Sequence, residues 1–464
     1  MAESPVAVFD RLVRQDAPES TPVLFDTACV LGGSVAGLLA ARVLADYARE
    51  VLVIERDETN VTGRPRPGVP HDRQAHALLP GGLALMERWL PGITGEMRDD
   101  GGVLVTADAM DLIVDGVEQL RTGDAHTLLC SRPFLESALR RRVLALPNVS
   151  AITAEVTGLV YRDDAVSSVR YMEEGDAEDI LPVDFVVDAM GRSSSLSDWL
   201  DEAGYSRPHQ QRLQTGIHYA TVVFGGDGTD RDRRFTALQY PRFAGPGGLA
   251  AGLVVPIEND QWMISLLVYG GNKPPGSVEE FRALCDKLPA PFGRAAGGVV
   301  VRDVLRYRQA TSRRRDFVGL RRFPARLVSV GDAAVSLNAK YAQGVSSAAL
   351  HAACLSDYLA DAPDPALPAD RFFASQKVAT DAVWVPSADA DAVRADILQA
   401  IEVSDELQRQ RAATEQLMRA ALTDATVAEA HRAVRFMFAH PDTLADPALL
   451  ERAAAVNQGA GSPS

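Results

Sequence analysis

The residues best suited to chemistry near the start of the chain form a glycine-rich turn between an apolar run and a stretch of helical periodicity. Residues 32–37 read Gly-Gly-Ser-Val-Ala-Gly, which follows the pattern G-x-G-x-x-G with Ser34 in place of the second glycine. Gly32 and Gly37 permit a tight turn and close packing of helix against strand, so that backbone N–H groups at the helix start face a pyrophosphate. The alternative interpretation is a turn that serves packing alone.

An acidic residue closes the next apolar run. Glu55, followed by Arg56, ends the run 51–54 (VLVI) about 20 residues after the turn, where a carboxylate accepts hydrogen bonds from ribose hydroxyl groups. A glutamate at this point argues against a bound 2′-phosphate. With a strand before the turn and a helix after it, the pattern predicts dinucleotide binding and leaves FAD and NAD open.

Two later segments each end a buried strand in a turn of small residues. Residues 184–192 read DFVVDAMGR. Residues 327–345 read LVSVGDAAVSLNAKYAQGV, in which a loop leads from the end of the apolar run to the start of a helix. These two turns and the start of the helix contain five candidate site residues: Asp188, Gly331, Asp332, Gly344 and Val345.

The three ordered motifs together resemble those of the flavin-dependent, aromatic-hydroxylase-like monooxygenases, often called group A. Within that family the chain looks most like bacterial tailoring enzymes of polyketide pathways, such as polyether epoxidases, because residues 64–92 are similar to the segment after their ribose-binding acid. The resemblance spans residues 27–440 and implies FAD as the cofactor. It also implies an activity, in which NADPH or NADH reduces FAD and a flavin hydroperoxide then hydroxylates or epoxidises an apolar substrate.

The resemblance implies roles for individual residues. Asp332 would hold the ribityl or pyrophosphate part of FAD, and the backbone at Gly344 and Val345 would lie beside the pyrimidine edge of the flavin. A helix N-terminus there suits the negative charge of a reduced flavin. Asp188 would lie near the pyrophosphate and the path of NAD(P)H. Arg132 matches an arginine that contacts FAD in the family. The alternative interpretation is that Arg132 is a surface residue at the start of a helix.

The loop before Gly344 departs from the family pattern N-P-x-Y-G-Q-G. Residues 338–344 read NAKYAQG, so Ala339 replaces a proline, which fixes a backbone angle, and Ala342 replaces a glycine, which admits positive φ. This loop borders the oxygen-reactive side of the flavin in the family. One interpretation is harmless variation. The other is a redox-neutral enzyme similar to the flavoprotein-like [4+2] cyclases that form decalins, in which FAD is structural and catalysis is by proximity.

The elements that must position these residues alternate between strand-like and helical patterns from residue 27 to about 205, which predicts a βαβ unit and a parallel sheet. Consecutive strand-like runs with short links follow between 217 and 269, and short links favour antiparallel pairing. The predicted fold is α/β: a Rossmann-like FAD-binding domain with an inserted antiparallel-sheet substrate domain and a helical C-terminal region. The expected segments are 1–26 (N-terminal extension), 27–205 and 320–360 (two parts of the FAD-binding domain), 206–319 (substrate domain) and 361–464 (helical region with a disordered tail).

The inserted sheet is expected to cover the flavin and to carry the substrate. Alternate residues of a strand point to opposite faces, so His218 and Tyr219 cannot both face a pocket. The sequence leaves open which face does, and aromatic side chains in such runs are more often core than ligand contacts. The pocket candidates are His218, Gln239, Tyr240 and Trp262.

Composition disfavours several classes of protein. The 464 residues are 47% hydrophobic and 23% charged, which is ordinary for a globular protein, and the net charge of −15 disfavours nonspecific binding to nucleic acid or an anionic membrane surface. No apolar run reaches the roughly 18 residues of a membrane span, and no secretory signal is visible. The four cysteines show no metal spacing. We expect a cytoplasmic enzyme, without a metal, that acts on a small apolar molecule.

Overall fold

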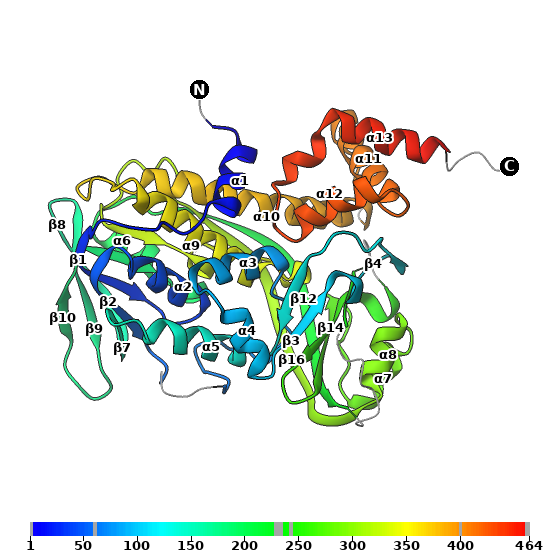
Figure 1. Cartoon of the computed structure of the whole chain (residues 1–464), viewed down its shortest axis with the longest axis horizontal. Coiled ribbons are helices and arrows are strands. Elements are labelled where there is room, and N and C mark those ends of the chain that lie inside the picture. The colour runs from blue at the N-terminus through cyan, green and yellow to red at the C-terminus, as the bar shows by residue number, and fades with distance from the viewer. Residues whose placement is uncertain (1–2, 59–62, 227–234, 241–244, 399–400, 460–464) are drawn as a thin grey trace.

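A five-stranded parallel sheet, ordered β17-β11-β1-β2-β7, forms the left part of the molecule in Figure 1. The structure, a computed structural model, describes residues 3–58, 63–226, 235–240, 245–398 and 401–459. Its strands β11 and β17 and the C-terminal halves of β1 and β2 are largely buried on both faces, as is typical of parallel sheets. The α/β prediction is therefore confirmed. The strands are β1 (Phe25–Leu31), β2 (Ala48–Glu55), β7 (Val149–Thr153), β11 (Phe185–Asp188) and β17 (Leu327–Ser329).

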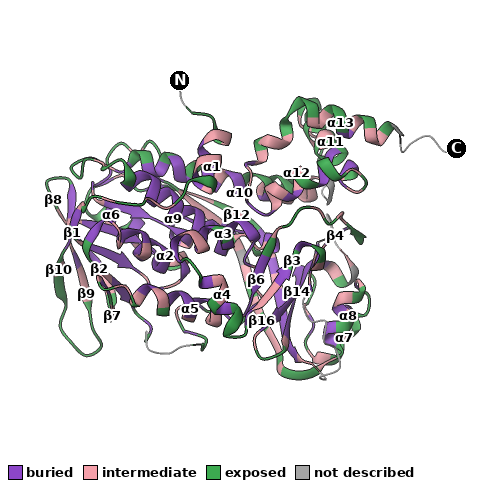
Figure 2. Cartoon of the chain, viewed as in Figure 1, coloured by how far each residue is buried: buried purple, intermediate pink, exposed green. Residues whose placement is uncertain are grey.

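Helices enclose this sheet. α2 (Val35–Leu44) contacts β1 and β2 and packs on α5 (Arg132–Leu144) and α9 (Gly344–Ala360). Figure 2 shows α2 and α9 as mostly buried, in line with the small and apolar residues that fill both helices. Further helices of this part are α1 (Pro5–Arg14), α3 (Pro80–Trp89), α4 (Ile93–Asp99) and α6 (Leu196–Glu202).

An eight-stranded sheet occupies the lower right of Figure 1 and runs in the order β18-β16-β12-β15-β14-β13-β4-β5. Its neighbouring strands are antiparallel except for β13 and β4, which are parallel. The expected antiparallel sheet is thus mixed, because β4 joins it from a part of the chain that precedes residue 206. The strands are β4 (Met110–Val114), β5 (Val117–Glu118), β12 (His209–Gly225), β13 (Thr236–Tyr240), β14 (Leu249–Ile257), β15 (Gln261–Tyr269), β16 (Val299–Asp316) and β18 (Val335–Ser336).

The two faces of this sheet have different partners. α7 (Val278–Cys285) and α8 (Ala290–Ala296) cover one face, where Phe224 packs with Phe281 and Phe292. The other face carries a second set of buried side chains, which we call the apolar wall. The apolar wall consists of Leu112, Val114, Ile217, Tyr219, Ala250, Ala251, Leu267 and Tyr269.

Strands β12 and β16 form a long ribbon that extends beyond the sheet toward the parallel sheet. They contain 17 and 18 residues and stay paired from Gly225–Val299 to His209–Asp316. Two smaller sheets complete the β structure, a three-stranded one ordered β10-β9-β8 and a pair of β3 and β6. Their strands are β3 (Val103–Thr106), β6 (His126–Leu129), β8 (Glu155–Arg162), β9 (Ala165–Met172) and β10 (Asp179–Pro182).

The C-terminal region is helical, as predicted. α10 (Asp370–Leu398) packs on α9 and contains Pro386, and α11 (Asp405–Ala420) begins after Ser404, whose hydroxyl accepts the N–H of Leu407 at 3.3 Å. α11 packs with α12 (Ala425–Arg435) and α13 (Pro447–Gly459) around a separate apolar core. Over the described ranges no helix is long and apolar enough to cross a membrane.

Candidate cofactor and substrate site

The glycine-rich turn lies where the ends of β1 and β11 meet the start of α2. Gly32 has φ +108°, a conformation that favours glycine, and a Cβ there would lie 2.5 Å from the carbonyl oxygen of Ala189. A Cβ at Gly37 would overlap the carbonyl oxygen of Gly32. Both glycines are therefore required for the turn, which brings the first N–H groups of α2 to the edge of the sheet.

Glu55 lies beside this turn at the end of β2. Its carboxylate accepts hydrogen bonds from the N–H of Gly33 at 2.8 Å and from the N–H of Asp57 at 3.1 Å. The side chain is buried, whereas neighbouring Arg56 is exposed. The structure thus brings Glu55 to the glycine turn and leaves Arg56 outside it.

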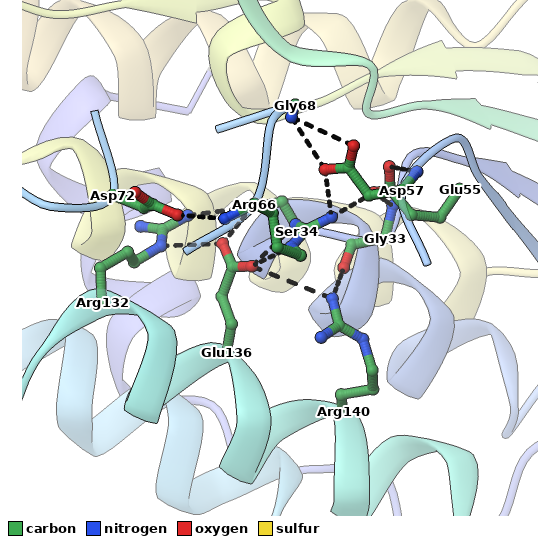
Figure 3. A network of polar contacts seen from close by, with 10 residues as sticks. All are labelled: Gly33, Ser34, Glu55, Asp57, Arg66, Gly68, Asp72, Arg132, Glu136 and Arg140. Atoms are coloured by element: carbon green, nitrogen blue, oxygen red, sulfur yellow. Dashed lines mark hydrogen bonds and ion pairs between the residues drawn. The ribbon is translucent and has the colours of Figure 1, made fainter. Parts of the chain in front are cut away.

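A buried network of arginines and carboxylates adjoins the turn (Figure 3). At its centre is Glu136 of α5, which accepts hydrogen bonds from Arg66 at 2.8 Å, from Arg132 at 2.9 Å and from the hydroxyl of Ser34. Arg140 lies 3.9 Å from the same carboxylate and donates to the carbonyl oxygen of Gly33 at 2.9 Å. α5 can present these groups on one face because Arg132, Glu136 and Arg140 are spaced by four residues.

The charges of this network compensate one another. Arg66 also pairs with Glu55 at 3.2 Å and with Asp57 at 3.1 Å. Burial alone would raise the pKa of Glu136, but the guanidinium groups of Arg132 and Arg66 and the Ser34 hydroxyl lower it to about 2. Glu136 is therefore ionised at neutral pH.

Asp188 ends β11 and is fully buried. Its carboxylate accepts hydrogen bonds from the hydroxyls of Ser194 at 2.7 Å and Ser329 at 3.1 Å, and from the N–H of Met190 at 3.1 Å. Burial raises its pKa, and the Ser194 hydroxyl opposes that effect. Asp188 thus connects the ends of two parallel strands to the following turn, and its observed partners are all within the protein.

The pair Gly331-Asp332 lies next to the glycine turn. Gly331 has φ +60°, and a Cβ there would lie 2.5 Å from the Cβ of Ala36 in α2. Its N–H donates to Nδ1 of His351 at 2.9 Å, and burial lowers the pKa of His351 to about 4. The carboxylate of Asp332 makes no hydrogen bond or ion pair with any described residue. This carboxylate is therefore available to a ligand.

The loop before α9 holds a strained residue. Ala342 has φ +56°, the left-handed conformation that a glycine would adopt more easily. Asn338 caps the preceding turn by accepting the N–H of Lys340 at 3.0 Å. Gly344 follows at the start of α9; it is exposed, and a Cβ there would meet no atom within 4 Å. Val345 is buried behind it.

The residues present fit FAD. Ser34 precedes α2 without capping it, so the first N–H groups of α2, with Arg132 and Arg140 nearby, form a donor set suited to a diphosphate. The open space at Gly344 suits a flat ring system, and Asp332 offers an acceptor for hydroxyl groups. No cluster of three His, Cys, Asp or Glu side chains that could hold a metal occurs in the described part of the chain.

Three of the four pocket candidates lie on the face of the sheet that α7 and α8 cover, the side that the sequence left open. Trp262 packs against Phe235 with ring centroids 4.3 Å apart and planes tilted by 34°, and it belongs to the core under α7 and α8. His218 shares its face with Ala220 of that core. Gln239 is paired with Gly252, whose added Cβ would meet a ring atom of Phe292 at 2.7 Å. Tyr240 ends β13, and its side chain lies outside the described residues.

The opposite face of the sheet carries polar groups that were not among the pocket candidates predicted from the sequence. The Thr221 hydroxyl contacts Gln74 and Ser265, and Tyr219 donates to Gln309 at 2.9 Å. Lys340 donates to the hydroxyl of Tyr269 at 2.8 Å. Arg66, Glu136 and Arg140 were also omitted, although the four-residue spacing of Arg132, Glu136 and Arg140 was a visible signal of a shared helix face.

Comparison with known proteins identifies the family. The profile of the family described as "FAD binding domain" matches residues 26–364, and the chain belongs to this family, that of the aromatic-hydroxylase-like flavin monooxygenases. The chain is 35% identical over 345 residues to Protein Rv3254 of Mycobacterium tuberculosis (strain ATCC 25618 / H37Rv), covering 70% of this chain and 71% of that protein. FAD is therefore the cofactor that the family membership supports.

Solved structures share the fold. Flavin-dependent brominase Bmp2 has a TM-score of 0.63 at 16% identity and covers 95% of this chain and 98% of its own. The p-nitrophenol 4-monooxygenase PnpA from Pseudomonas putida DLL-E4 has a TM-score of 0.60 at 17% identity, covering 90% and 99%. The Diels-Alderase PyrE3 of the pyrroindomycin pathway has a TM-score of 0.55 at 19% identity, covering 89% and 80%. One fold thus serves proteins with different named activities.

Proposed function

We propose that the protein is an FAD-dependent monooxygenase that hydroxylates or epoxidises an apolar, polyketide-like small molecule in the cytoplasm, with NADPH or NADH as reductant. The observation that carries the proposal is the position of the loop 337–341, between the start of α9 and the apolar wall. The side-chain amide of Gln309 donates to the carbonyl oxygen of Leu337 at 2.8 Å, and Lys340 donates to Tyr269 of the wall at 2.8 Å. The expected flavin position at Gly344 is therefore one short loop from an apolar surface.

The chain contributes binding, orientation and exclusion of water. The N-terminus of α2 with Arg132 and Arg140 would hold the diphosphate, and Glu55 would accept the ribose hydroxyls. The N-terminus of α9 would stabilise negative charge on the flavin edge beside Gly344. When bound, FAD supplies the redox chemistry of the reaction. The apolar wall would keep water from the substrate during that reaction.

A redox-neutral [4+2] cyclase is the second candidate, favoured by one observation. Ala342 is held at φ +56° where the family pattern has glycine, and Ala339 stands where it has proline. A Cβ at this point would narrow the space between the loop and a flavin beside Gly344. The likeness to PyrE3, named as a Diels-Alderase, agrees with this alternative at the level of fold. In a cyclase the apolar wall would hold a reactive conformer of a polyene.

Anaerobic reduction separates the two candidates. The FAD-loaded protein is mixed anaerobically with NADPH or NADH in the presence of candidate polyene substrates, and flavin reduction is followed as the loss of flavin absorbance. Oxygen is then admitted, and the masses of the products are measured by mass spectrometry. For a monooxygenase we expect flavin reduction and a product heavier by one oxygen atom. A product of unchanged mass, formed without nicotinamide, would refute the monooxygenase and establish the cyclase.

A further inference from the structure

A group of hydrogen-bond donors lies at the edge of the apolar wall that the loop 337–341 contacts. Lys340 is 4% exposed, and its ammonium lies 2.8 Å from the hydroxyl of Tyr269 and 5.5 Å from the centre of that ring. The guanidinium carbon of Arg394, from α10, lies 3.8 Å from the centre of the same ring. Two cationic side chains therefore converge on one buried phenol.

Two of these donors have no acceptor within the described residues. The Tyr269 oxygen accepts from Lys340, and its own O–H donates to no residue of the described ranges. Nε of Arg394 is buried and makes no hydrogen bond to the described chain. A buried hydrogen-bond donor without an acceptor costs free energy. The Tyr269 hydroxyl and Nε of Arg394 therefore favour the binding of an acceptor from outside the protein.

The electrostatics of the group favour an anion. Burial raises the pKa of Tyr269 to about 12 against the effect of Arg394, so the phenol stays neutral and keeps its proton to donate. Asp391 of α10 acts electrostatically on Lys340 and Tyr269, and it already accepts the side-chain amide of Asn338 at 2.8 Å. Asp115 is the second carboxylate that acts on Lys340, so the donors of this group that remain without an acceptor in the described residues are the Tyr269 hydroxyl and Nε of Arg394.

We propose that Lys340, Tyr269 and Arg394 form a binding site for an ionised oxygen, a carboxylate or an enolate, carried by the apolar substrate. This inference rests on the proposed function in placing the substrate against the apolar wall. The substrate would lay its hydrocarbon part on the wall and its charged oxygen on the three donors. Charge-assisted hydrogen bonds of this kind would fix the end of the molecule that does not react.

Binding to the oxidised, FAD-loaded protein tests this site without any turnover. Isothermal titration measures the dissociation constants of 2-naphthoate and 4-hydroxycoumarin, which are anions at pH 7.5, and of their neutral counterparts 2-naphthamide and coumarin. We expect at least one anion to bind about 10- to 100-fold more tightly than its neutral counterpart. The pair that shows the larger preference distinguishes a carboxylate site from an enolate site.

Variants assign the preference to these residues. Lys340→Met and Tyr269→Phe should each remove most of it, whereas Lys287→Met, at an exposed lysine of the substrate sheet region, should leave it unchanged. Equal affinities for anion and neutral counterpart, absence of binding by all four probes, or a preference that survives both variants would overturn the site. Tyr269→Phe keeps the ring that packs in the wall and serves if Lys340→Met does not fold.

The outcome is independent of the reaction type. A protein that fails to reduce FAD with nicotinamide but prefers the anions would refute the monooxygenase and retain the site. A protein that reduces FAD but shows no preference would retain the monooxygenase and refute the site. If Lys340 only ties β15 to the loop, both variants would lower the unfolding temperature without changing the ratio of affinities, which also counts against the proposal.

Discussion

Replacement of Glu136 by glutamine should destabilise the protein, because this carboxylate is the common partner of three buried guanidinium groups. Its side chain is 5% exposed, and its pKa falls from 4.5 to about 2 on folding. A carboxyl group with this change contributes about 3 kcal/mol of folding stability at neutral pH. Removal of one partner from a buried ion pair typically costs 3–5 kcal/mol, roughly the same size. We therefore expect Glu136→Gln to lower the free energy of unfolding by about 3 kcal/mol at pH 7.

The pH dependence gives this prediction a second measurable part. Because the pKa of Glu136 is lower in the folded state, its contribution is complete above the unfolded value of 4.5 and is lost as the pH falls through about 2. The difference between the native protein and the variant should thus shrink to about 1.4 kcal/mol at pH 3.

Urea unfolding of the FAD-free proteins, followed by far-ultraviolet circular dichroism, measures both quantities. Glu96→Gln is the matched control, because Glu96 pairs with Arg142 at the surface and exposed pairs are worth about 0.5 kcal/mol. A loss below about 1 kcal/mol for Glu136→Gln, or a loss equal to that of Glu96→Gln, would refute the view that the buried network is held together by this carboxylate.

Three further substitutions test the placement of the site. Gly37→Ala should yield protein with little bound FAD, measured as flavin absorbance per mole of chain, because the added Cβ overlaps the Gly32 carbonyl; a full complement of FAD would contradict this. Ala342→Gly should raise the free energy of unfolding by about 0.5–1 kcal/mol in urea, since relief of the left-handed conformation outweighs the entropy of glycine. Trp262→Ala should lower it by about 3–5 kcal/mol and leave the dissociation constant of FAD unchanged; weakened FAD binding would place Trp262 nearer the cofactor than the structure does.

The backbone of the cofactor site was predictable because its signals are local. The turn at Gly32 and Gly37, the acid at Glu55 and the pair Gly331-Asp332 each follow a short apolar strand, and the structure brings them to one edge of the parallel sheet. Asp188 ends a buried strand, as the sequence indicates, but its carboxylate is occupied by Ser194, Ser329 and Met190, which local sequence does not indicate.

The substrate face was not predictable for a physical reason. Both faces of β15 and of the second half of β12 are largely buried. Apolar residues therefore predominate on both faces, and alternation carries little information about which face covers the cofactor. Packing of α7 and α8 decides this, and it removes His218 and Trp262 from the face that carries the apolar wall. The parallel pairing of β4 with β13 depends on contacts between distant segments and is equally invisible locally.

The paired course of β12 and β16 makes the substrate sheet interchangeable in principle. Because His209 lies opposite Asp316, the chain enters and leaves this region on adjacent strands, about 4.8 Å apart. Recombination between related genes at these two points would exchange everything in between and rejoin the chain without a new linker. The edge contact of β13 with β4, the pairing of β16 with β18 and the contacts of the sheet with the loop 337–341 would have to be matched. The ribbon thus offers a route by which substrate range diverges during evolution, or is altered by chimera construction, while the glycine turn and its arginine network are inherited intact.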